Sequence, residues 1–460
     1  MKAPAVQPDK KAPNPLGTAP IAPLIAKYAV PSIISMLVMA AYNITDQIFI
    51  GRTVGMLGNA ATNVAFPMSM LSSTFALLIG IGTAANFNIC MGEKKEDAAA
   101  QFLGTGLVVL LSIGVLFMGT VFIFKTHLLL LCGATPSVFP FANAYLGITA
   151  FGIPFFTFTQ AAAYLIRADG RPAYSMLCSS AGAVLNVFLD WLFLFYFKMG
   201  IGGAALATVI GQFVSFVLCA FYFTQFKSFK VRLTMFAVNV PYLIKIVKLG
   251  SSNFINHIIM STVMIVMNNT LKYYGGLSAY GSDIPLAVSG VIAKLSAILT
   301  GITVGLAQGC QPIFGFNAGA KNYARVKETY KKACIATLTV SVTVFLIFQI
   351  FPRAIISIFG VGDESYFEFA EKYLRIFLMM VCVHGMQPLT VTYFTATGKA
   401  KPAALLSLSR QGFFLIPLLV TLPMIFGLNG ALYAGPIADT LAFLLSVVLV
   451  VVDFKRMPVV

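Results

Sequence analysis

Two carboxylates lie within apolar stretches of this sequence, where charged side chains are rare. Asp190 follows Asn186 by one helical turn, so both side chains share a helix face. Asp46 lies in the first apolar segment, one turn after Tyr42. A carboxylate at the centre of a membrane costs about 2.5–3.5 kcal/mol on insertion scales, so it indicates a functional residue by default. We expect Asp46 and Asp190 to meet inside a helical bundle and to bind a proton or a sodium ion. The alternative is that each is a structural acid bonded to nearby hydroxyls and amides.

Composition places these acids in a membrane. The chain has 460 residues, is 58% hydrophobic and has a mean hydropathy of +0.88. Its charges lie in short loops between apolar runs of about twenty residues, the length that a helix needs to cross a bilayer. The Lys and Arg residues that give the chain its net charge of +16 flank these runs. This position indicates that they orient the protein in a membrane and do not bind nucleic acid. The sequence therefore predicts an all-α membrane protein.

Twelve spans are predicted, and basic residues orient them. With the N-terminus inside, 22 of the 31 Lys and Arg residues fall in inside segments and 7 in outside loops, so both termini are expected in the cytoplasm. Residues 1–24 are expected to be a disordered cytoplasmic tail. The spans lie near residues 29–50, 60–90, 101–124, 139–166, 172–197, 201–224, 249–274, 286–316, 331–351, 369–396, 402–426 and 429–452.

The two halves of the chain resemble each other. Three stretches recur in order at offsets of 227–231 residues, for example Gly200–Ala204 and Gly427–Ala431. Six helices separate the copies, which predicts two six-helix bundles related by a pseudo-two-fold axis along the membrane normal. We expect bundles over residues 25–224 and 249–454, joined by a cytoplasmic linker over 225–248. Asp46 and Asp190 have no carboxylate counterparts, and Asp439 maps onto Gln212.

Several motifs are similar to those of the multidrug and toxic compound extrusion (MATE) family, and most like its MepA-like bacterial branch. They cover most of the chain beyond residue 24. The stretches that carry the resemblance are Ile44–Arg52, Asn186…Leu189-Asp190…Phe193, Gly200…Gly203–Ala205…Ala207-Thr208…Gln212 and Gly305…Gln308-Gly309…Gln311-Pro312…Phe316-Asn317…Gly319-Ala320…Arg325-Val326.

The resemblance implies a twelve-helix antiporter in the cytoplasmic membrane of a bacterium. Such a protein expels lipophilic, mostly cationic organic compounds in exchange for protons or sodium. Its cation site would comprise Tyr42, Asp46, Asn186, Asp190 and Thr208, and the last four offer oxygen ligands for sodium. The sequence does not choose between the ions. Some members use a seventh-helix glutamate, but that position lies close to Met260 here, which argues against coupling through the C-terminal bundle.

Other polar residues within the spans are candidates for contact with the cargo. Asp439 could contact a cation or stabilise its own bundle, and Lys294 could pair with an acid or extend to an interface. Amides also hold membrane helices together without any role in binding. The candidate set is Asn43, Gln160, Asn268, Gln308, Gln387 and Asp439.

Two other functions compete with export. A flippase of a lipid-linked precursor, from the same superfamily, should carry several cations in its cavity, whereas Lys294 and Arg410 are the only basic residues deep within the predicted spans, away from their ends. An enzyme is not indicated, because HExxH, GxSxG and GxxxxGK[ST] are absent. We therefore expect a monomeric transporter of small molecules with no cofactor.

Overall fold

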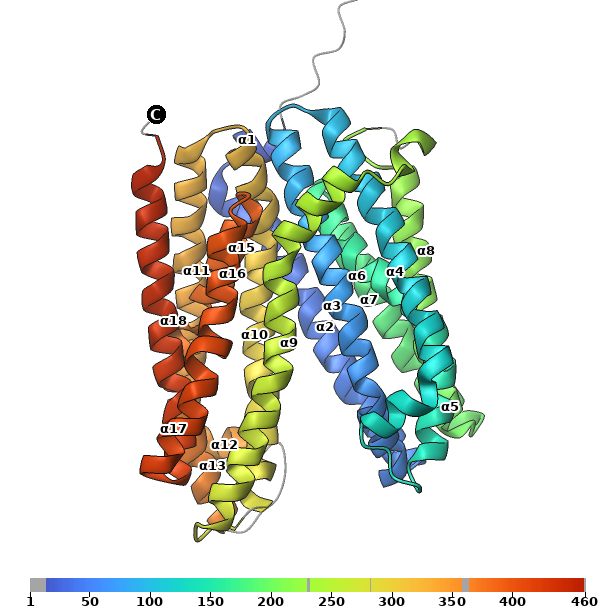
Figure 1. The fold of residues 1–460 in the computed structure, drawn as a ribbon, viewed down its shortest axis with the longest axis vertical. Helices are drawn as coiled ribbons and strands as arrows, with labels where there is room; N and C mark the ends of the chain where they lie inside the picture. The colour runs from blue at the N-terminus through green and yellow to red at the C-terminus, as the bar shows by residue number, and fades with distance from the viewer. Residues whose placement is uncertain (1–13, 230–231, 282, 358–363, 459–460) are drawn as a thin grey trace, which may run out of the picture.

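The computed structural model describes residues 14–229, 232–281, 283–357 and 364–458. This part of the chain is helical and contains no strand. Eleven helices are long and apolar enough to cross a membrane, and a pair bent by 45°, Glu364–Phe377 with Val381–Ala396, makes a twelfth span if counted as one. The helices form two bundles that lie side by side (Figure 1). The predicted all-α, twelve-helix, two-bundle architecture is therefore confirmed.

The helices occur in chain order. The N-terminal bundle comprises α2 (Ile21–Thr53), α3 (Met56–Gly92), α4 (Glu96–Leu131), α5 (Phe139–Thr149), the 3-10 turn η1 (Ala150–Gly152), α6 (Ile153–Ala168), α7 (Pro172–Asp190), the π-helical η2 (Trp191–Tyr196) and α8 (Gly200–Thr224). The C-terminal bundle comprises α9 (Val240–Gly276), α10 (Asp283–Gly319), α11 (Tyr323–Ile350), α12 (Pro352–Ser357), α13 (Glu364–Phe377), α14 (Val381–His384), α15 (Met386–Ala396), α16 (Ala400–Leu408), the π-helical η4 (Ser409–Leu415), α17 (Ile416–Phe426) and α18 (Leu428–Arg456).

The expected tail over residues 1–24 is partly folded. Residues 1–13 lie outside the described part, but α1 (Pro15–Thr18) packs on the end of α10, and Leu16 is buried. Asn317 Nδ2 donates to the Leu16 carbonyl at 2.9 Å, and Arg325 Nη2 donates to the Ala19 carbonyl at 2.7 Å. These bonds satisfy carbonyls at the end of a short helix, so the expectation of disorder was wrong for residues 14–24.

The linker is shorter than predicted and lies on the N-terminal bundle. The seventh span begins at Val240 rather than near residue 249, and η3 (Leu233–Phe236) packs along α4. Asp169, in the α6–α7 turn, accepts bonds from Tyr222 Oη (2.7 Å), from the N–H groups of Lys227 (2.7 Å) and Ser228 (2.8 Å), and from Ser228 Oγ (2.5 Å). Burial raises the pKa of the Asp169 carboxyl, and these hydrogen bonds oppose the rise.

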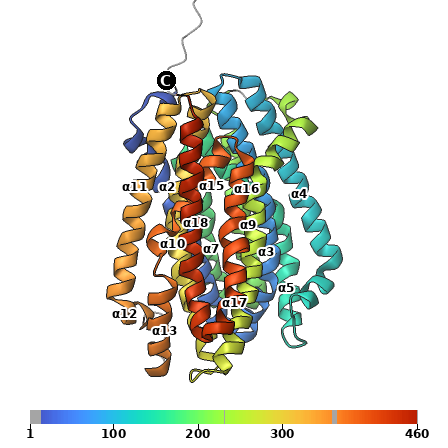
Figure 2. The ribbon, with the colours of Figure 1, turned by 60° about the vertical axis from the view of Figure 1, so that its left-hand side comes forward.

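Glycines allow the bundles to meet closely at one end. A Cβ added at Gly309 of α10 would lie 2.5 Å from Ala29 Cα of α2, and one at Gly305 would lie 2.8 Å from Ile33 Cα. The second seam, between α3 and α9, is as tight, since a Cβ at Gly250 would lie 1.7 Å from the Leu78 carbonyl oxygen. Figures 1 and 2 both show α3 beside α9. Glycine is the residue that permits such backbone contact.

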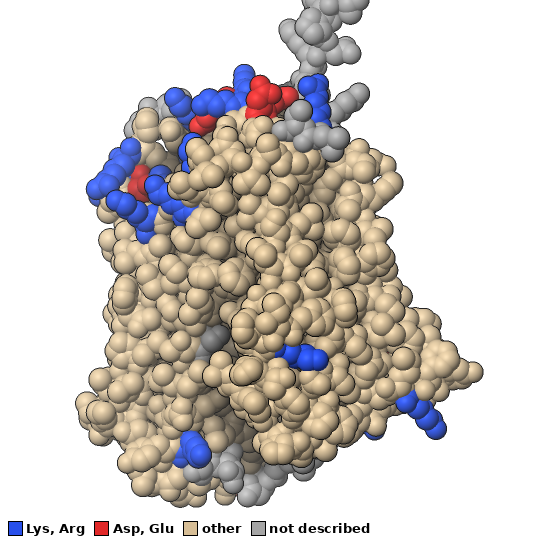
Figure 3. Space-filling view, turned by 45° about the vertical axis from the view of Figure 1, so that its right-hand side comes forward, with Lys and Arg blue, Asp and Glu red and all other residues tan. Residues whose placement is uncertain are grey.

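The α2–α10 seam loosens toward the other end. At Gly301 a Cβ would lie 3.6 Å from Met36 Cβ, an ordinary contact. Further along, Asn43 of α2 and Lys294 of α10 are exposed, whereas Ala29 and Gly309 are buried. The tight end is the one that carries both described termini (Figure 1), and charged side chains gather at the same end in Figure 3. The seam is therefore closed at the charged end and opens away from it.

Candidate ion site and its surroundings

The structure brings Asp46 and Asp190 together inside the N-terminal bundle. Asp46 comes from α2 and is 7% exposed, and Asp190 ends α7 and is fully buried. Their carboxyl groups lie within hydrogen-bonding reach of each other. One oxygen of each, Oδ1, receives no hydrogen bond from any other described group. Two carboxyl groups in this arrangement can share one proton.

Asn186 connects Asp190 to α8. Turned so that its nitrogen faces the carboxylate, the amide donates to Asp190 Oδ2 at 3.0 Å and accepts from the Thr208 N–H at 3.0 Å. This orientation satisfies both ends of the amide, which the opposite one does not. Thr208 Oγ1 in turn donates to the Ala204 carbonyl at 3.0 Å. The predicted set of Asp46, Asn186, Asp190 and Thr208 thus forms one cluster from three helices.

Two tyrosines enclose this cluster. Tyr42, which the resemblance implied, lies on α2 one turn before Asp46 and lines the same cavity as Thr208. Tyr145 of α5 lies close to Thr208 and to both carboxyl groups. The sequence did not predict Tyr145 as part of this cluster, because no regular spacing connects it to the acids. Its position beside them depends on the packing of α5 against α8.

The helix carrying Asp190 changes geometry directly after that residue. Residues Trp191–Tyr196 form the π-helical segment η2. A π-helical turn widens the helix and re-aims the side chains beside it, and such turns occur frequently at functional sites. The C-terminal bundle also contains a π-helical segment, η4, but this one carries Arg410 rather than a carboxylate. The irregular turns therefore position different chemistry in the two halves.

A small cavity adjoins the cluster around the acids. Its volume is about 60 Å³. Polar groups on its wall include Tyr42, Asn186 and Thr208 of the cluster, together with Gln160 and Gln212. Gln160 Nε2 also donates to Ser73 Oγ at 3.4 Å. The cavity thus continues the polar cluster into the bundle, and Gln160 is the member of the predicted cargo set that lines it.

Three other members of that set lie on helices that border the seam. Asn43 and Asn268 are exposed, on α2 and α9 respectively. Gln308 is buried at the closed end, where its Oε1 accepts from Arg167 Nη2 of the other bundle at 3.3 Å. Arg167, which follows the predicted span 139–166, is 4% exposed within the last turn of α6 and packs over Tyr164. No described carboxylate lies within 4 Å of its guanidinium.

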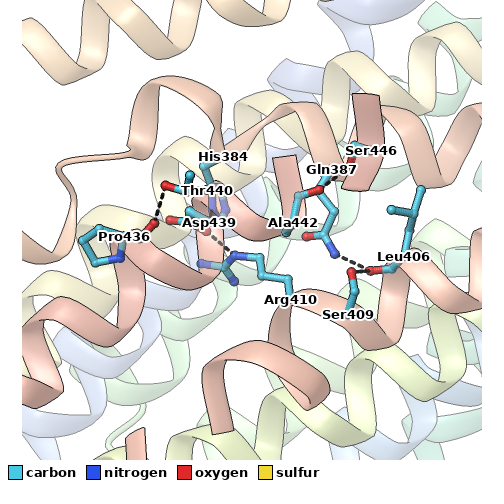
Figure 4. Close-up of polar contacts among 10 residues, drawn as sticks. All are labelled: His384, Gln387, Leu406, Ser409, Arg410, Pro436, Asp439, Thr440, Ala442 and Ser446. Carbon is cyan, nitrogen blue, oxygen red and sulfur yellow. Dashed lines mark hydrogen bonds and ion pairs between the residues drawn. The ribbon is translucent and has the colours of Figure 1, made fainter. Parts of the chain in front are cut away.

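Asp439 and Gln387 lie inside the C-terminal bundle. Asp439 Oδ1 accepts from Arg410 Nε and lies 3.3 Å from His384 Nδ1 (Figure 4). Gln387 Nε2 donates to the Leu406 carbonyl at 2.6 Å. Of the two roles weighed for Asp439, this ion pair favours stabilisation of the bundle. The six predicted cargo residues do not form one surface.

The groups around the two carboxylates limit which ions this site could bind. In the described part of the chain, no three His, Cys, Asp or Glu side chains are placed to hold a metal ion. Around the acid pair, the Asn186 nitrogen faces Asp190 and its oxygen is taken by the Thr208 N–H. At Asp190 the Asn186 amide therefore presents a hydrogen-bond donor rather than a further oxygen ligand.

Comparison with known proteins identifies the family. The family model MatE matches residues 31–192 and 254–421. Among curated proteins, the chain is similar to the multidrug export protein MepA of Staphylococcus saprophyticus, with 26% identity over 443 residues and 94% of each chain covered. MepA of Staphylococcus aureus strain N315 is 24% identical over 451 residues, covering 96% of each.

Solved structures agree with this assignment. The MATE multidrug transporter DinF-BH, solved in complex with a ligand, superposes with a TM-score of 0.87 at 34% identity, covering 95% of this chain and 97% of that one. An outward-facing MATE transporter of the MOP superfamily shares the fold, with a TM-score of 0.87 at 19% identity and 96% and 99% coverage. The chain therefore belongs to the MATE family of membrane transporters.

Proposed function

We propose that the protein is a secondary antiporter that exports lipophilic, mostly cationic organic compounds in exchange for an inward-moving ion. The observation that carries the proposal is the Asp46–Asp190 pair, enclosed within one bundle of a two-bundle transporter fold. The family and the names of the MepA relatives support export of several drugs. They do not favour the flippase alternative.

The cavity beside the acids is too small for a drug-sized cargo, so we propose separate sites for the ion and the cargo. Pockets for drug-sized ligands occupy about 300–1,000 Å³. The cavity beside the acids measures about 60 Å³, well below that range. We therefore assign the acid pair to the coupling ion and the open part of the seam between the bundles to the cargo.

We infer that the coupling ion is a proton rather than sodium. Two carboxyl groups that face each other without a donor between them require a shared proton to be stable in a bundle interior. Sodium would need additional oxygen ligands, and the Asn186 oxygen is already taken by the Thr208 N–H. Release of the proton would leave two adjacent charges, which would favour another arrangement of α2 and α7.

The proposed transport cycle uses the seam between the bundles. With the charged end in the cytoplasm, as the basic residues indicate, the state described here is closed to the cytoplasm and open outward. Both termini would then be cytoplasmic, in the plasma membrane of a bacterium. Cargo and ion would each shift the equilibrium between the outward and inward states. Each ligand shifts it only as far as its own affinity differs between the two states.

The test is ion exchange by purified protein, a monomer in this proposal, in proteoliposomes. We expect Asp46→Asn to abolish drug-driven proton movement while the protein stays folded, because one member of the pair can no longer ionise. Asp97→Asn, which alters an exposed acid at the start of α4, should exchange normally. Imposing pH and sodium gradients separately distinguishes the ions. Full exchange by Asp46→Asn would refute the proposed role of the pair.

A further inference from the structure

Lys294 lies on the face of α10 that meets α2. Gly309, Gly305 and Gly301 on this face contact Ala29, Ile33 and Met36 of α2 in turn. Residues seven apart share a helix face, so Lys294 continues the same stripe two turns beyond Gly301. Lys294 is exposed, whereas Gly305 and Gly309 are buried. The lysine therefore lies where this seam has opened.

The pairing of the two helices fixes what Lys294 faces. Residues 29, 33 and 36 of α2 lie beside 309, 305 and 301 of α10, as in an antiparallel pair with equal rise. If the same pairing continues along the two helices toward the open end of the seam, Lys294 of α10 lies opposite Asn43 and Ile44 of α2. Asn43 is exposed, and its Nδ2 donates to the Met39 carbonyl at 2.7 Å. Its side-chain oxygen has no partner among the described residues and remains available as an acceptor.

Lys294 is also electrically isolated. No described carboxylate lies within 4 Å of its ammonium group. The acid nearest in depth, Asp46, points into the N-terminal bundle and is 7% exposed, and Asp439 is taken by Arg410. A lysine within a membrane span that has no described carboxylate partner is a functional-site hypothesis by default.

We propose that Lys294 contacts the cargo and binds a carboxylate or another anionic group on it, so that this residue sets the preference between zwitterions and simple cations. This inference rests on the proposed export function. An ammonium group offers three donors and a point charge to such a group, while the Asn43 oxygen on the facing helix can accept from the cationic part. A cation without an acidic group gains nothing from Lys294.

A matched pair of dyes tests this proposal. Rhodamine 6G is an ester and a cation, and rhodamine 19 is its free acid, a zwitterion with the same ring system. In proteoliposomes we expect Lys294→Met to lower the transport of rhodamine 19 relative to rhodamine 6G by about tenfold, the effect of losing one charge-assisted hydrogen bond. Lys294→Arg should keep the wild-type ratio. Lys198→Met, in an exposed loop between η2 and α8, is the control for loss of one charge.

The outcomes separate the two proposals. If the wild type exports both dyes and Lys294→Met leaves their ratio unchanged, or lowers both equally, the contact with Lys294 is refuted while the export function stands. If the wild type exports neither dye, the export function fails and this inference fails with it. A lower ratio in both Lys294→Met and Lys198→Met would assign the effect to net charge and would also overturn the contact.

Discussion

Closure at the charged end depends on backbone contact that only glycine permits, and Gly309→Ala tests this dependence. The added Cβ would lie 2.5 Å from Ala29 Cα, whereas Cβ atoms in real structures essentially never approach below 3.0 Å. Because the obstacle is backbone rather than a flexible side chain, α2 and α10 must move apart. The same change at Gly301 meets Met36 Cβ at 3.6 Å and requires no movement. Gly301→Ala is therefore a matched control on the same face of the same helix.

The size of the effect follows from overpacking. Extra methyl groups in well-packed contacts cost about 1–3 kcal/mol. This penalty applies only to the state with a closed inner end, because the methyl group has room once the bundles separate there. At about 1.4 kcal/mol per factor of ten, the closed state should lose about 5- to 140-fold in population relative to the inward-open state. The gain in helix propensity from Gly to Ala is common to both variants and cancels in their comparison.

Distances between spin labels can measure this shift. Labels at Asp97 on α4 and Lys401 on α16, both exposed near the inner ends of the two bundles, can be placed in a parent lacking its seven cysteines. Gly309→Ala should lengthen the distance distribution, and Gly301→Ala should match the parent. Identical distributions for all three proteins would refute the argument that glycine contact controls closure.

Three further predictions concern buried charges. Asp439→Asn should lower stability by about 3–5 kcal/mol because it leaves Arg410 buried and unpaired, and adding Arg410→Met should recover most of this in thermal unfolding; a double variant no more stable than the single would contradict it. Arg167→Met should favour the closed inner end, because it removes a buried cation that no described carboxylate pairs, and a longer Asp97–Lys401 label distance would contradict this. Asp169→Asn should speed hydrogen exchange at the linker N–H groups that it bonds by about tenfold or more, and unchanged exchange would refute its anchoring role.

The sequence predicted the scaffold well because membrane spans depend on composition, which is local. Apolar runs of sufficient length gave all twelve spans, with the seventh beginning nine residues earlier than expected, at Val240. The meeting of Asp46 and Asp190 was also predictable, since an acid at membrane depth needs a partner and few were available.

What the sequence missed depends on which helices are neighbours. Helical periodicity shows the face on which a residue lies but not the helix that packs there. Tyr145 joins the acids because α5 lies beside α8, and Arg410 reaches Asp439 from a helix 29 residues away in the chain. Arg167 looked like an ordinary loop cation because it ends a span, and only the closed seam buries it.

The duplicated fold also explains why ion coupling would belong to one bundle. In the repeat, Asp439 corresponds to Gln212, which lines the small cavity beside the acid pair. The C-terminal bundle pairs Asp439 with Arg410 at the corresponding depth, so an incoming cation finds its negative charge already neutralised. The N-terminal bundle keeps its cavity and supplies Asp46 and Asp190 without a described basic partner. A scaffold that began with two equivalent halves would thereby hold one exchangeable proton and one permanent ion pair.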